Sequence, residues 1–407
     1  MSAGIWLGPR RAKALAARFG TPFYAYSSRL VRARCRALKR AFPEAQIRYA
    51  MKSNACPSLL ALVQREGLGV DTVSPWEVRL ARELGFRKRD IIYSGNMPSD
   101  DDLAAVHRAG VMINLDALSA LRRYGRRFPG SRVSLRLNLE VGGGHHPHVI
   151  TAGPDSKFGL GVDELPEARA IAAEHRLTIA GLHQHIGSGI FELDLFLQAL
   201  EPLLALLRDF PDLEFVDIGG GFGVPYRAEE SPVDLDAWGA AVASRFQAAT
   251  KLYGRPLSLV IEPGRYVSCE AGLLVARVTT VKRTRDRVFV GTDSGMHHLI
   301  RPALYQAWHP VTTYPRRDGA PERCEVVGPI CESGDVLAAE RVMPVPEEGD
   351  LVVVGNAGAY GFAMASHYNL RARPAEVMVD GDDWHLARER EGYRDVVPRG
   401  AVRLAKR

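Results

Sequence analysis

Short apolar runs alternate with amphipathic stretches from about residue 29 to residue 268. The short runs have the composition and length of β-strands, and the stretches between them have helical spacing of their apolar residues. Pro57 and Pro75 stand where the first turn of a helix accepts proline. The predicted strands are 46–51, 68–73, 90–94, 112–115, 132–139, 179–186, 214–218 and 258–261, and the predicted helices include 58–66, 75–84, 101–109, 164–174, 193–208 and 235–249.

Eight strands, each paired with a helix, are what a (β/α)8 barrel requires. The span from about residue 30 to 265 is close to the ~250 residues typical of that fold. After Cys269 the pattern changes to strands separated by turns, at 273–282, 287–291, 324–327, 335–337, 351–354 and 375–379.

The chain is therefore predicted to be α/β, with two domains and an N-terminal segment. A (β/α)8 TIM-like barrel is expected at 29–268, and a C-terminal all-β domain, a Greek-key-like barrel or sandwich, at 269–407. The run Pro22–Tyr26 precedes the first barrel strand, so segment 1–28 is expected to pair with the β domain.

Composition narrows the class of protein further. The 407 residues are 46% hydrophobic and 25% charged, which is ordinary for a soluble globular chain. The net charge of +6 suits anionic ligands, but no nucleic-acid-binding signature is present and no such partner is predicted. Five cysteines without a CxxC pair argue against a disulfide framework and a structural zinc site, and favour a reducing compartment.

Neither a secretory signal nor a membrane-spanning segment is predicted. The first eleven residues lack a basic segment followed by an apolar core. No apolar run approaches the ~20 residues that a spanning helix needs. We therefore expect a cytoplasmic protein without a membrane partner.

Polar residues collect where the predicted barrel strands end. Because barrel chemistry occurs at the carboxyl ends of the strands, these residues are expected to share one rim. They are Lys52, Asp71, Asn138, His183-Gln-His185-Ile-Gly-Ser188, Gly219-Gly-Gly-Phe-Gly223 and Glu262-Pro-Gly-Arg265. A lysine that ends a buried strand is costly to desolvate unless it is used, and the alternative is a lysine that reaches solvent.

The glycine-rich run and the histidines each leave two interpretations. Gly219–Gly223 does not fit a dinucleotide fingerprint, because Val224 stands where a third glycine is needed. It suits a phosphate held by backbone N–H groups, and equally a tight strand–helix turn. His183 and His185 alternate along a predicted strand and so point the same way. One is expected to pack flat on an aromatic ring and the other to be a barrel-core residue.

No metal site is predicted. A metal held by these two histidines together with His145–His148 is disfavoured, because that second cluster lies in a Gly-rich loop without a partnering carboxylate.

Several motifs resemble the fold-type III pyridoxal-phosphate-dependent decarboxylases, which pair an alanine-racemase-like barrel with a β domain. In the barrel they are Tyr49-Ala-Met-Lys-Ser-Asn54, His185-Ile-Gly-Ser-Gly189, Asp217-Ile-Gly-Gly-Gly-Phe-Gly223 and Glu262-Pro-Gly-Arg265. The C-terminal motifs look like those of the diaminopimelate decarboxylases: Asp293-Ser-Gly-Met296, Arg301-Pro-Ala-Leu-Tyr305, Gly328-Pro-Ile-Cys-Glu-Ser-Gly-Asp335, and Gly358-Ala-Tyr360 with Met364-Ala-Ser-His-Tyr-Asn369. The resemblance runs from about residue 20 to 395, and the combination of motifs is specific although each alone is weak.

The resemblance implies pyridoxal 5'-phosphate as the cofactor. Lys52 would bind it covalently, and the cofactor would act as an electron sink. Glu262 would keep the pyridine nitrogen protonated, and His185 would stack on the ring. Gly221, its neighbours and the main chain at 264–265 would hold the phosphate. The implied cofactor-binding residues are Lys52, Asp71, His185, Ser188, Gly220, Gly221, Glu262, Gly264, Arg265 and Tyr360.

The resemblance also implies decarboxylation of meso-2,6-diaminopimelate to L-lysine and CO2, the last step of lysine biosynthesis. An arginine fork would bind the distal carboxylate of this substrate, and Glu332 would pair with its distal ammonium. The implied substrate-binding residues are Arg265, Arg301, Tyr305, Glu332 and Tyr360, and the implied catalytic residues are Lys52, His185 and Cys331. Cys331 would protonate the carbon that has lost CO2.

In this family the Cys-Glu loop reaches the neighbouring subunit's site. Cys331 and Glu332 would therefore serve the partner's site, and a homodimer is implied.

Three other functions are alternatives to the decarboxylation of diaminopimelate. Related decarboxylases of ornithine, lysine or arginine have substrates without a distal carboxylate, so Arg301 and Glu332 would match them poorly. A secondary-metabolism relative could keep the same clamp for another carboxylated amino acid, including one carried on a protein. A catalytically dead cofactor-binding homologue is disfavoured, because it has no chemical need for both Lys52 and Cys331.

Overall fold

The computed structural model describes residues 4–144, 146, 151–153 and 156–397. The chain divides into two compact units. The barrel unit comprises Val31–Val224 and Pro232–Val267. The β unit comprises the described residues of Met1–Leu30, Pro225–Ser231 and Ser268–Arg407. The β unit is therefore built from three separate stretches of the chain.

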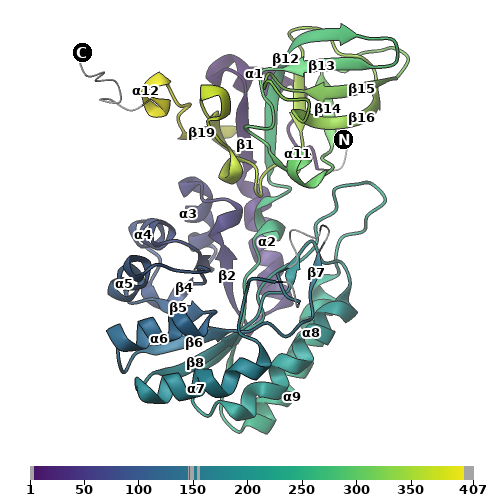
Figure 1. The fold of residues 1–407 in the computed structure, drawn as a ribbon. Coiled ribbons are helices and arrows are strands. Elements are labelled where there is room, and N and C mark those ends of the chain that lie inside the picture. The colour runs from purple at the N-terminus through teal and green to yellow at the C-terminus, as the bar shows by residue number, and fades with distance from the viewer. Residues whose placement is uncertain (1–3, 145, 147–150, 154–155, 398–407) are drawn as a thin grey trace, which may run out of the picture. The chain divides into compact units, whose positions relative to one another are not determined.

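The barrel unit is a closed barrel of parallel strands covered by helices (Figure 1). Around the barrel the strand order is β10-β11-β2-β3-β4-β5-β6-β8. These strands are β2 (Gln46–Ala50), β3 (Gly69–Thr72), β4 (Ile91–Tyr93), β5 (Met112–Leu115), β6 (Arg132–Arg136), β8 (Thr178–His183), β10 (Phe215–Asp217) and β11 (Ser258–Ile261). The barrel confirms the predicted fold class.

Helices follow most of these strands. They are α2 (Ser28–Ala41), α3 (Pro57–Arg65), α4 (Pro75–Glu83), α5 (Asp100–Ala109), α6 (Leu118–Arg127), α7 (Leu165–Glu174), α8 (Leu193–Ala205) and α9 (Leu235–Tyr253). Helix α4 begins at Pro75, and the Ser74 side chain caps it by accepting the Glu77 N–H. Such local signals explain why the sequence predicted most of these helices, although α2 and α6 lay outside the predicted ranges.

The β unit contains a mixed sheet with the strand order β16-β15-β13-β12-β1-β18-β19, and β17 joins β14 to β12. Its strands are β1 (Phe23–Ser27), β12 (Gly272–Arg283), β13 (Val288–Thr292), β14 (Val311–Tyr314), β15 (Glu322–Val327), β16 (Val336–Met343), β17 (Leu351–Val354), β18 (Ala375–Asp380) and β19 (Asp383–Arg388). Strand β1 pairs with β12 on one side and β18 on the other. The apolar side chains of these three strands pack with helix α1 (Pro9–Phe19) in one core.

Six predicted barrel strands end earlier than expected, two of them (132–139 and 179–186) by three residues, and one of these differences affects the site. Strand 179–186 was predicted, but β8 ends at His183, so His185 lies beyond the ladder. The expectation that His183 and His185 alternate along one strand is therefore wrong. The chain turns away there because the Ile186 carbonyl accepts the N–H of Gly143, in the short strand β7 (Gly143–Gly144), instead of continuing the barrel.

Gly239 lies where helix α9 meets the end of helix α2. A Cβ at this position would lie 1.9 Å from the Ala41 carbonyl oxygen. Gly239→Ala should therefore destabilise the barrel by about 1–3 kcal/mol through overpacking, although alanine is the better helix former. The measurement is the thermal unfolding midpoint of the purified protein, which should fall by about 2–4 °C or more.

The matched control is Ser244→Ala, at an exposed position of the same helix. It changes helix propensity without a close contact, so the midpoint should stay or rise slightly. If the thermal unfolding midpoint of Gly239→Ala equals that of the wild type, the close packing of α2 and α9 is contradicted.

Candidate active site

Lys52 stands just after the carboxyl end of β2, in the 3-10 turn η1 (Met51–Ser53). Its Nζ lies 3.1 Å from Oδ2 of Asp71, which is fully buried at the end of β3. Burial raises the pKa of Asp71, the charge of Glu262 adds to this, and the Lys52 ammonium opposes it. The lysine side chain is 35% exposed, so the buried carboxylate holds an amine that a small molecule can still reach.

The turn that carries Lys52 is fixed by its neighbours in the sequence. The Ser53 hydroxyl lies 2.9 Å from the Ala50 carbonyl oxygen and 2.9 Å from the Tyr49 hydroxyl. The Tyr49 hydroxyl in turn donates to the Asn54 carbonyl at 3.0 Å. The Tyr-Ala-Met-Lys-Ser-Asn motif is thus a hydrogen-bonded unit that sets the direction of the lysine.

His183 and Glu262 form a buried pair at the ends of β8 and β11. His183 Nε2 lies 3.0 Å from Glu262 Oε2, and both residues are almost inaccessible to solvent. Burial alone would raise the pKa of Glu262, but the charge and hydrogen bond of His183 outweigh it and hold that pKa below its usual range. Glu262 Oε1 is buried without a hydrogen-bond partner among the described residues. An ionised carboxylate with one unused oxygen fits a protonated ring nitrogen.

Asp217 lies close to this pair. One ligand atom from each of His183, Asp217 and Glu262 lies within 4.8 Å of the others, a spacing that could hold a metal ion. Asp217 Oδ1 accepts the Gly219 N–H at 2.9 Å, and burial raises the pKa of Asp217 well above its usual value. Because the His183–Glu262 contact is already made, the three residues together are explained by hydrogen bonding within the barrel core. His145 and His148, the other histidines weighed as metal ligands, lie outside the described residues.

The glycine-rich loop lies against His185. Nδ1 of His185 accepts the Gly220 N–H at 3.2 Å, and the Gly221 carbonyl accepts the N–H groups of Gly189 and Ile190. Gly221 has a φ of +109°, and a Cβ on Gly220 would lie 2.1 Å from the Glu262 carbonyl oxygen. The loop is therefore restricted to glycine by both backbone conformation and space, as a loop that approaches a phosphate closely must be.

Arg265 and Ser188 meet beside this loop. Arg265 begins the short helix α10 (Arg265–Ser268), and its Nε and Nη2 lie 3.1 and 3.0 Å from the Ser188 hydroxyl. The arginine is 6% exposed. Gly264 precedes it, and a Cβ there would lie 3.1 Å from the Ala50 side chain. The Glu262-Pro-Gly-Arg265 motif is thereby packed against the strand that precedes Lys52.

The structure thus brings the predicted barrel residues into one cluster at the carboxyl ends of the strands. Asn138 belongs to the same end but has a structural role. Its side chain donates to the Gly153 carbonyl and accepts the Gly153 and Glu140 N–H groups.

In the β unit, Arg301 is 1% exposed at the start of helix α11 (Arg301–Tyr305). Its Nη1 donates to the Tyr226 hydroxyl at 2.9 Å and lies 3.0 Å from His309 Nε2. His309 Nδ1 lies 2.9 Å from the Gly355 carbonyl, so Nδ1 carries the proton and Nε2 accepts from the arginine. Arg301 has no carboxylate partner among the described residues. Sequence reasoning missed Tyr226 and His309, which lie outside the recognised motifs.

The Cys331–Glu332 turn is exposed and held by a distant motif. Cys331 Sγ lies 3.2 Å from Asn369 Nδ2, and the Tyr368 hydroxyl donates to the Glu332 carboxylate. Two motifs recognised separately in the sequence therefore form one surface. Tyr305 is half-buried on α11.

Asp335 fixes the end of this turn. Its carboxylate accepts the N–H groups of Met296 and Ile330 at 2.5 and 2.7 Å. A Cβ at Gly295 or Gly328 would collide with the same carboxylate, at 2.4 Å. Tyr360, in the neighbouring Gly-Ala-Tyr motif, has a φ of +58°.

A partly exposed lysine held by a buried carboxylate, a second buried carboxylate with an unused oxygen, and a loop restricted to glycine are the groups that a pyridoxal-phosphate-dependent barrel enzyme needs. The family model described as "Pyridoxal-dependent decarboxylase, pyridoxal binding domain" matches residues 28–269. The residues present fit that cofactor, because Glu262 offers a buried oxygen without a partner and the glycine loop leaves no room for side chains.

The comparisons with full-length proteins narrow the family. A diaminopimelate decarboxylase from Methanothermobacter thermautotrophicus is 40% identical over 419 residues, covering 99% of this chain and 97% of that protein. A crystal structure of a diaminopimelate decarboxylase superposes with a TM-score of 0.92 at 30% identity, covering 97% of each chain. The Helicobacter pylori enzyme in complex with L-lysine gives a TM-score of 0.87 at 30% identity, covering 94% of this chain and 98% of that one. The chain belongs to the diaminopimelate decarboxylase family.

Among the described residues, no helix combines the length and the apolar character needed to cross a membrane.

Lys52→Ala should abolish both cofactor attachment and turnover, because it removes the amine that would bond covalently to the cofactor. The bound cofactor's visible absorption and the release of CO2 are the two measurements. Lys251→Ala, at an exposed position of α9, is the matched control and should leave both unchanged. Turnover by the Lys52→Ala protein would contradict the assignment of Lys52.

Proposed function

We propose that the protein decarboxylates meso-2,6-diaminopimelate to L-lysine and CO2, with pyridoxal 5'-phosphate as cofactor. The observation that carries the substrate assignment is Arg301, a buried guanidinium with neutral neighbours and no ion-pair partner among the described residues. A buried positive charge of this kind is costly unless an anion binds it. The distal carboxylate of diaminopimelate is such an anion, and ornithine, lysine and arginine lack it.

The barrel residues act on the cofactor end. When bound, the cofactor supplies an electron sink for the bond that breaks. Lys52 attaches it, and Asp71 orients the lysine amine through their 3.1 Å contact. Glu262, kept ionised by His183, would hold the ring nitrogen of the cofactor through Oε1. An ionised carboxylate at this position would favour a protonated ring nitrogen, which strengthens the electron sink.

His185 covers the ring as a neutral side chain. Burial, assisted by the charge of Lys52, holds the pKa of His185 well below its usual value, so it adds no second positive charge. Ser188, the glycines at 220 and 221, and the main chain at 264–265 would hold the phosphate. The Arg265 guanidinium contacts the Ser188 hydroxyl beside this position. Tyr360 adds a contact to the cofactor.

The remaining residues recognise the distal end of the substrate. Arg301, with Arg265, binds its carboxylate, and Tyr305 and Tyr360 add hydrogen bonds. Glu332 pairs with its ammonium. The Glu332 carboxylate already accepts a hydrogen bond from Tyr368, which holds it in one orientation.

Cys331 protonates the carbon that has lost CO2, and it does so in the neighbouring subunit of a homodimer. Two features support this: Cys331 and Glu332 are adjacent, and both are exposed. The reaction takes place in the cytoplasm. All five cysteines are free, the state that a reducing compartment maintains.

The assignment of the substrate is tested by CO2 release from the holoenzyme with meso-diaminopimelate, L-ornithine, L-lysine and L-arginine. Only meso-diaminopimelate should turn over fast. Arg301→Lys should raise the KM for it by about 10- to 100-fold, because a charged hydrogen bond contributes ~1.5–3 kcal/mol. The cofactor's absorption should be unchanged in that variant.

Arg18→Ala, which removes an exposed arginine, is the matched control and should leave the KM unchanged. Fast turnover of a substrate without the distal carboxylate would overturn the substrate assignment. Unchanged kinetics of Arg301→Lys would remove that residue from the substrate site.

The shared site is tested by mixing two inactive variants. If Lys52 and Cys331 of different subunits serve one site, co-refolded Lys52→Ala and Cys331→Ala chains regain activity in mixed dimers. Random mixing makes half of the dimers mixed, each with one intact site, so about a quarter of wild-type activity is expected. The two variants refolded separately are the control, and a mixture as inactive as they are would exclude sharing.

A further inference from the structure

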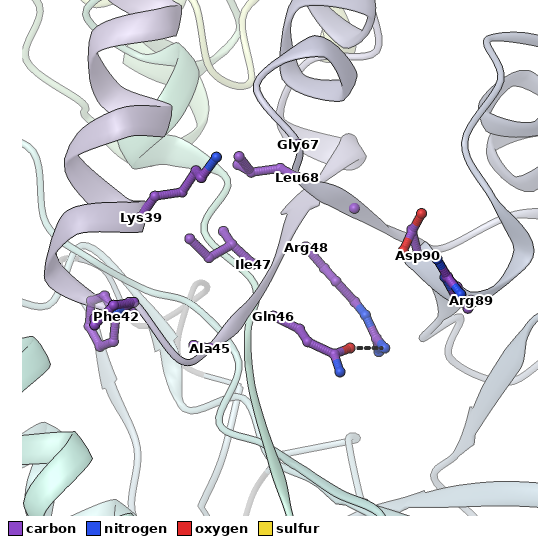
Figure 2. A pocket seen from close by; sticks show the side chains of 12 residues that line it. Lys39, Phe42, Ala45, Gln46, Ile47, Arg48, Gly67, Leu68, Arg89 and Asp90 are labelled. Carbon is purple, nitrogen blue, oxygen red and sulfur yellow. Dashed lines mark hydrogen bonds between the residues drawn. The ribbon is translucent and has the colours of Figure 1, made fainter.

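Two hollows open at the amino-terminal ends of the barrel strands, away from Lys52. The first, of about 400 Å³, is lined by the end of α2 and the starts of β2, β3 and β4 (Figure 2). The second, of about 500 Å³, continues past the starts of β5, β6, β10 and β11. Gln46, Arg48 and Arg89 line both hollows, so the two meet at these residues.

Arg48 has unused hydrogen-bond donors at this meeting point. It is 5% exposed, and Figure 2 shows its side chain extending from β2 to the Gln46 amide, where Nη2 donates to Oε1 at 3.2 Å. Its Nε and Nη1 are buried and have no hydrogen-bond partner among the described residues. The charge of a guanidinium buried with unsatisfied N–H groups is costly, and an anion bound in the adjacent hollow would reduce that cost.

Two further cations line the second hollow. Lys88 and Arg89, just before β4, are both exposed, and within the described part of the chain neither has a hydrogen-bond or ion-pair partner. Together with Arg48 they give three positive charges, one from β2 and two from the turn before β4, and β3 lies between these two strands. Lys39 adds a fourth amine, although its Nζ also donates to the Glu66 carbonyl.

The acidic residues that line the hollows are already engaged. Asp90 accepts from Arg87 at 2.6 and 3.2 Å, and Glu214 is bound to Arg132. Inside the barrel, the acidic charges that act on Arg48 are Asp217, which accepts the Gly219 N–H, followed by Glu262 and Asp71. At the second hollow, Arg48, Lys88 and Arg89 are the cations without an ion-pair partner among the described residues.

We propose that this end of the barrel is an anion site that binds a phosphate group through Arg48, Arg89 and Lys88. Phosphate carries up to two negative charges and several acceptor oxygens, which suit the three cations that line the second hollow. A single carboxylate would match only part of this set. The site uses no residue assigned to cofactor or substrate, so it does not depend on the decarboxylase function.

The test is calorimetric titration of the cofactor-loaded holoenzyme with inorganic phosphate. The bound cofactor fills the phosphate position of the active site, and the Arg89→Ala variant separates binding at the second site from binding at Arg301. We expect saturable binding of one phosphate per chain. Arg89→Ala, at an exposed position, should weaken it by at least about tenfold, as the loss of a charged hydrogen bond implies.

Two more variants complete the test. Arg48→Met should abolish binding, and circular dichroism shows whether that variant folds; the Arg89→Ala result decides the question if it does not. Arg18→Ala, an exposed arginine of the β unit, should bind phosphate as the wild type does. CO2 release by Arg89→Ala should equal that of the wild type, which separates this site from the reaction.

Absence of saturable phosphate binding to the wild-type holoenzyme would overturn the proposal. Equal affinity of Arg89→Ala and wild type would do the same. Titration with malonate is the comparison for carboxylates, and tighter binding of malonate than of phosphate would overturn the choice of phosphate.

Discussion

The His183–Glu262 contact is the interaction on which the barrel site depends. Three carboxylates, those of Asp71, Asp217 and Glu262, are fully or almost fully buried near one another, and such a cluster is stable only when cations and donors compensate it. His183 compensates Glu262, and Lys52 compensates Asp71. Breaking a buried pair typically costs ~3–5 kcal/mol, so each member of the cluster constrains the others and their positions are set together.

The parts of the site that the sequence predicted are those encoded locally. Parallel barrel strands are buried on both faces and read as short apolar runs, and a polar residue directly after such a run must lie at the rim. Lys52, Asp71 and Glu262 were found for this reason. The pairing of His183 with Glu262 was not, because it joins residues 79 positions apart, and a strand pattern gives no information on side-chain partners across a barrel.

Other features depended on contacts that no local pattern contains. Tyr226 and His309 contact Arg301 from separate parts of the chain, and nothing around them resembles a motif. Strand β19 was missed because it is short and lies at the edge of the sheet with most of its side chains exposed, so only Trp384 and Leu386 mark its apolar alternation. His185 was placed on a strand because apolar residues continue past the last ladder hydrogen bond, whereas the backbone turns to bond Gly143.

The position of β1 has a consequence for how the protein is made. On the ribosome, residues 23–27 emerge first, yet both strands that flank them, β12 and β18, come after the whole barrel sequence. Domains generally fold as they emerge, so the barrel can form while this N-terminal strand still has two unpaired edges. The nascent chain must carry an apolar strand without partners until β12 is synthesised, and with one unpaired edge until residue 380 is synthesised. The β unit is thus completed last, although it contains the first residues of the chain.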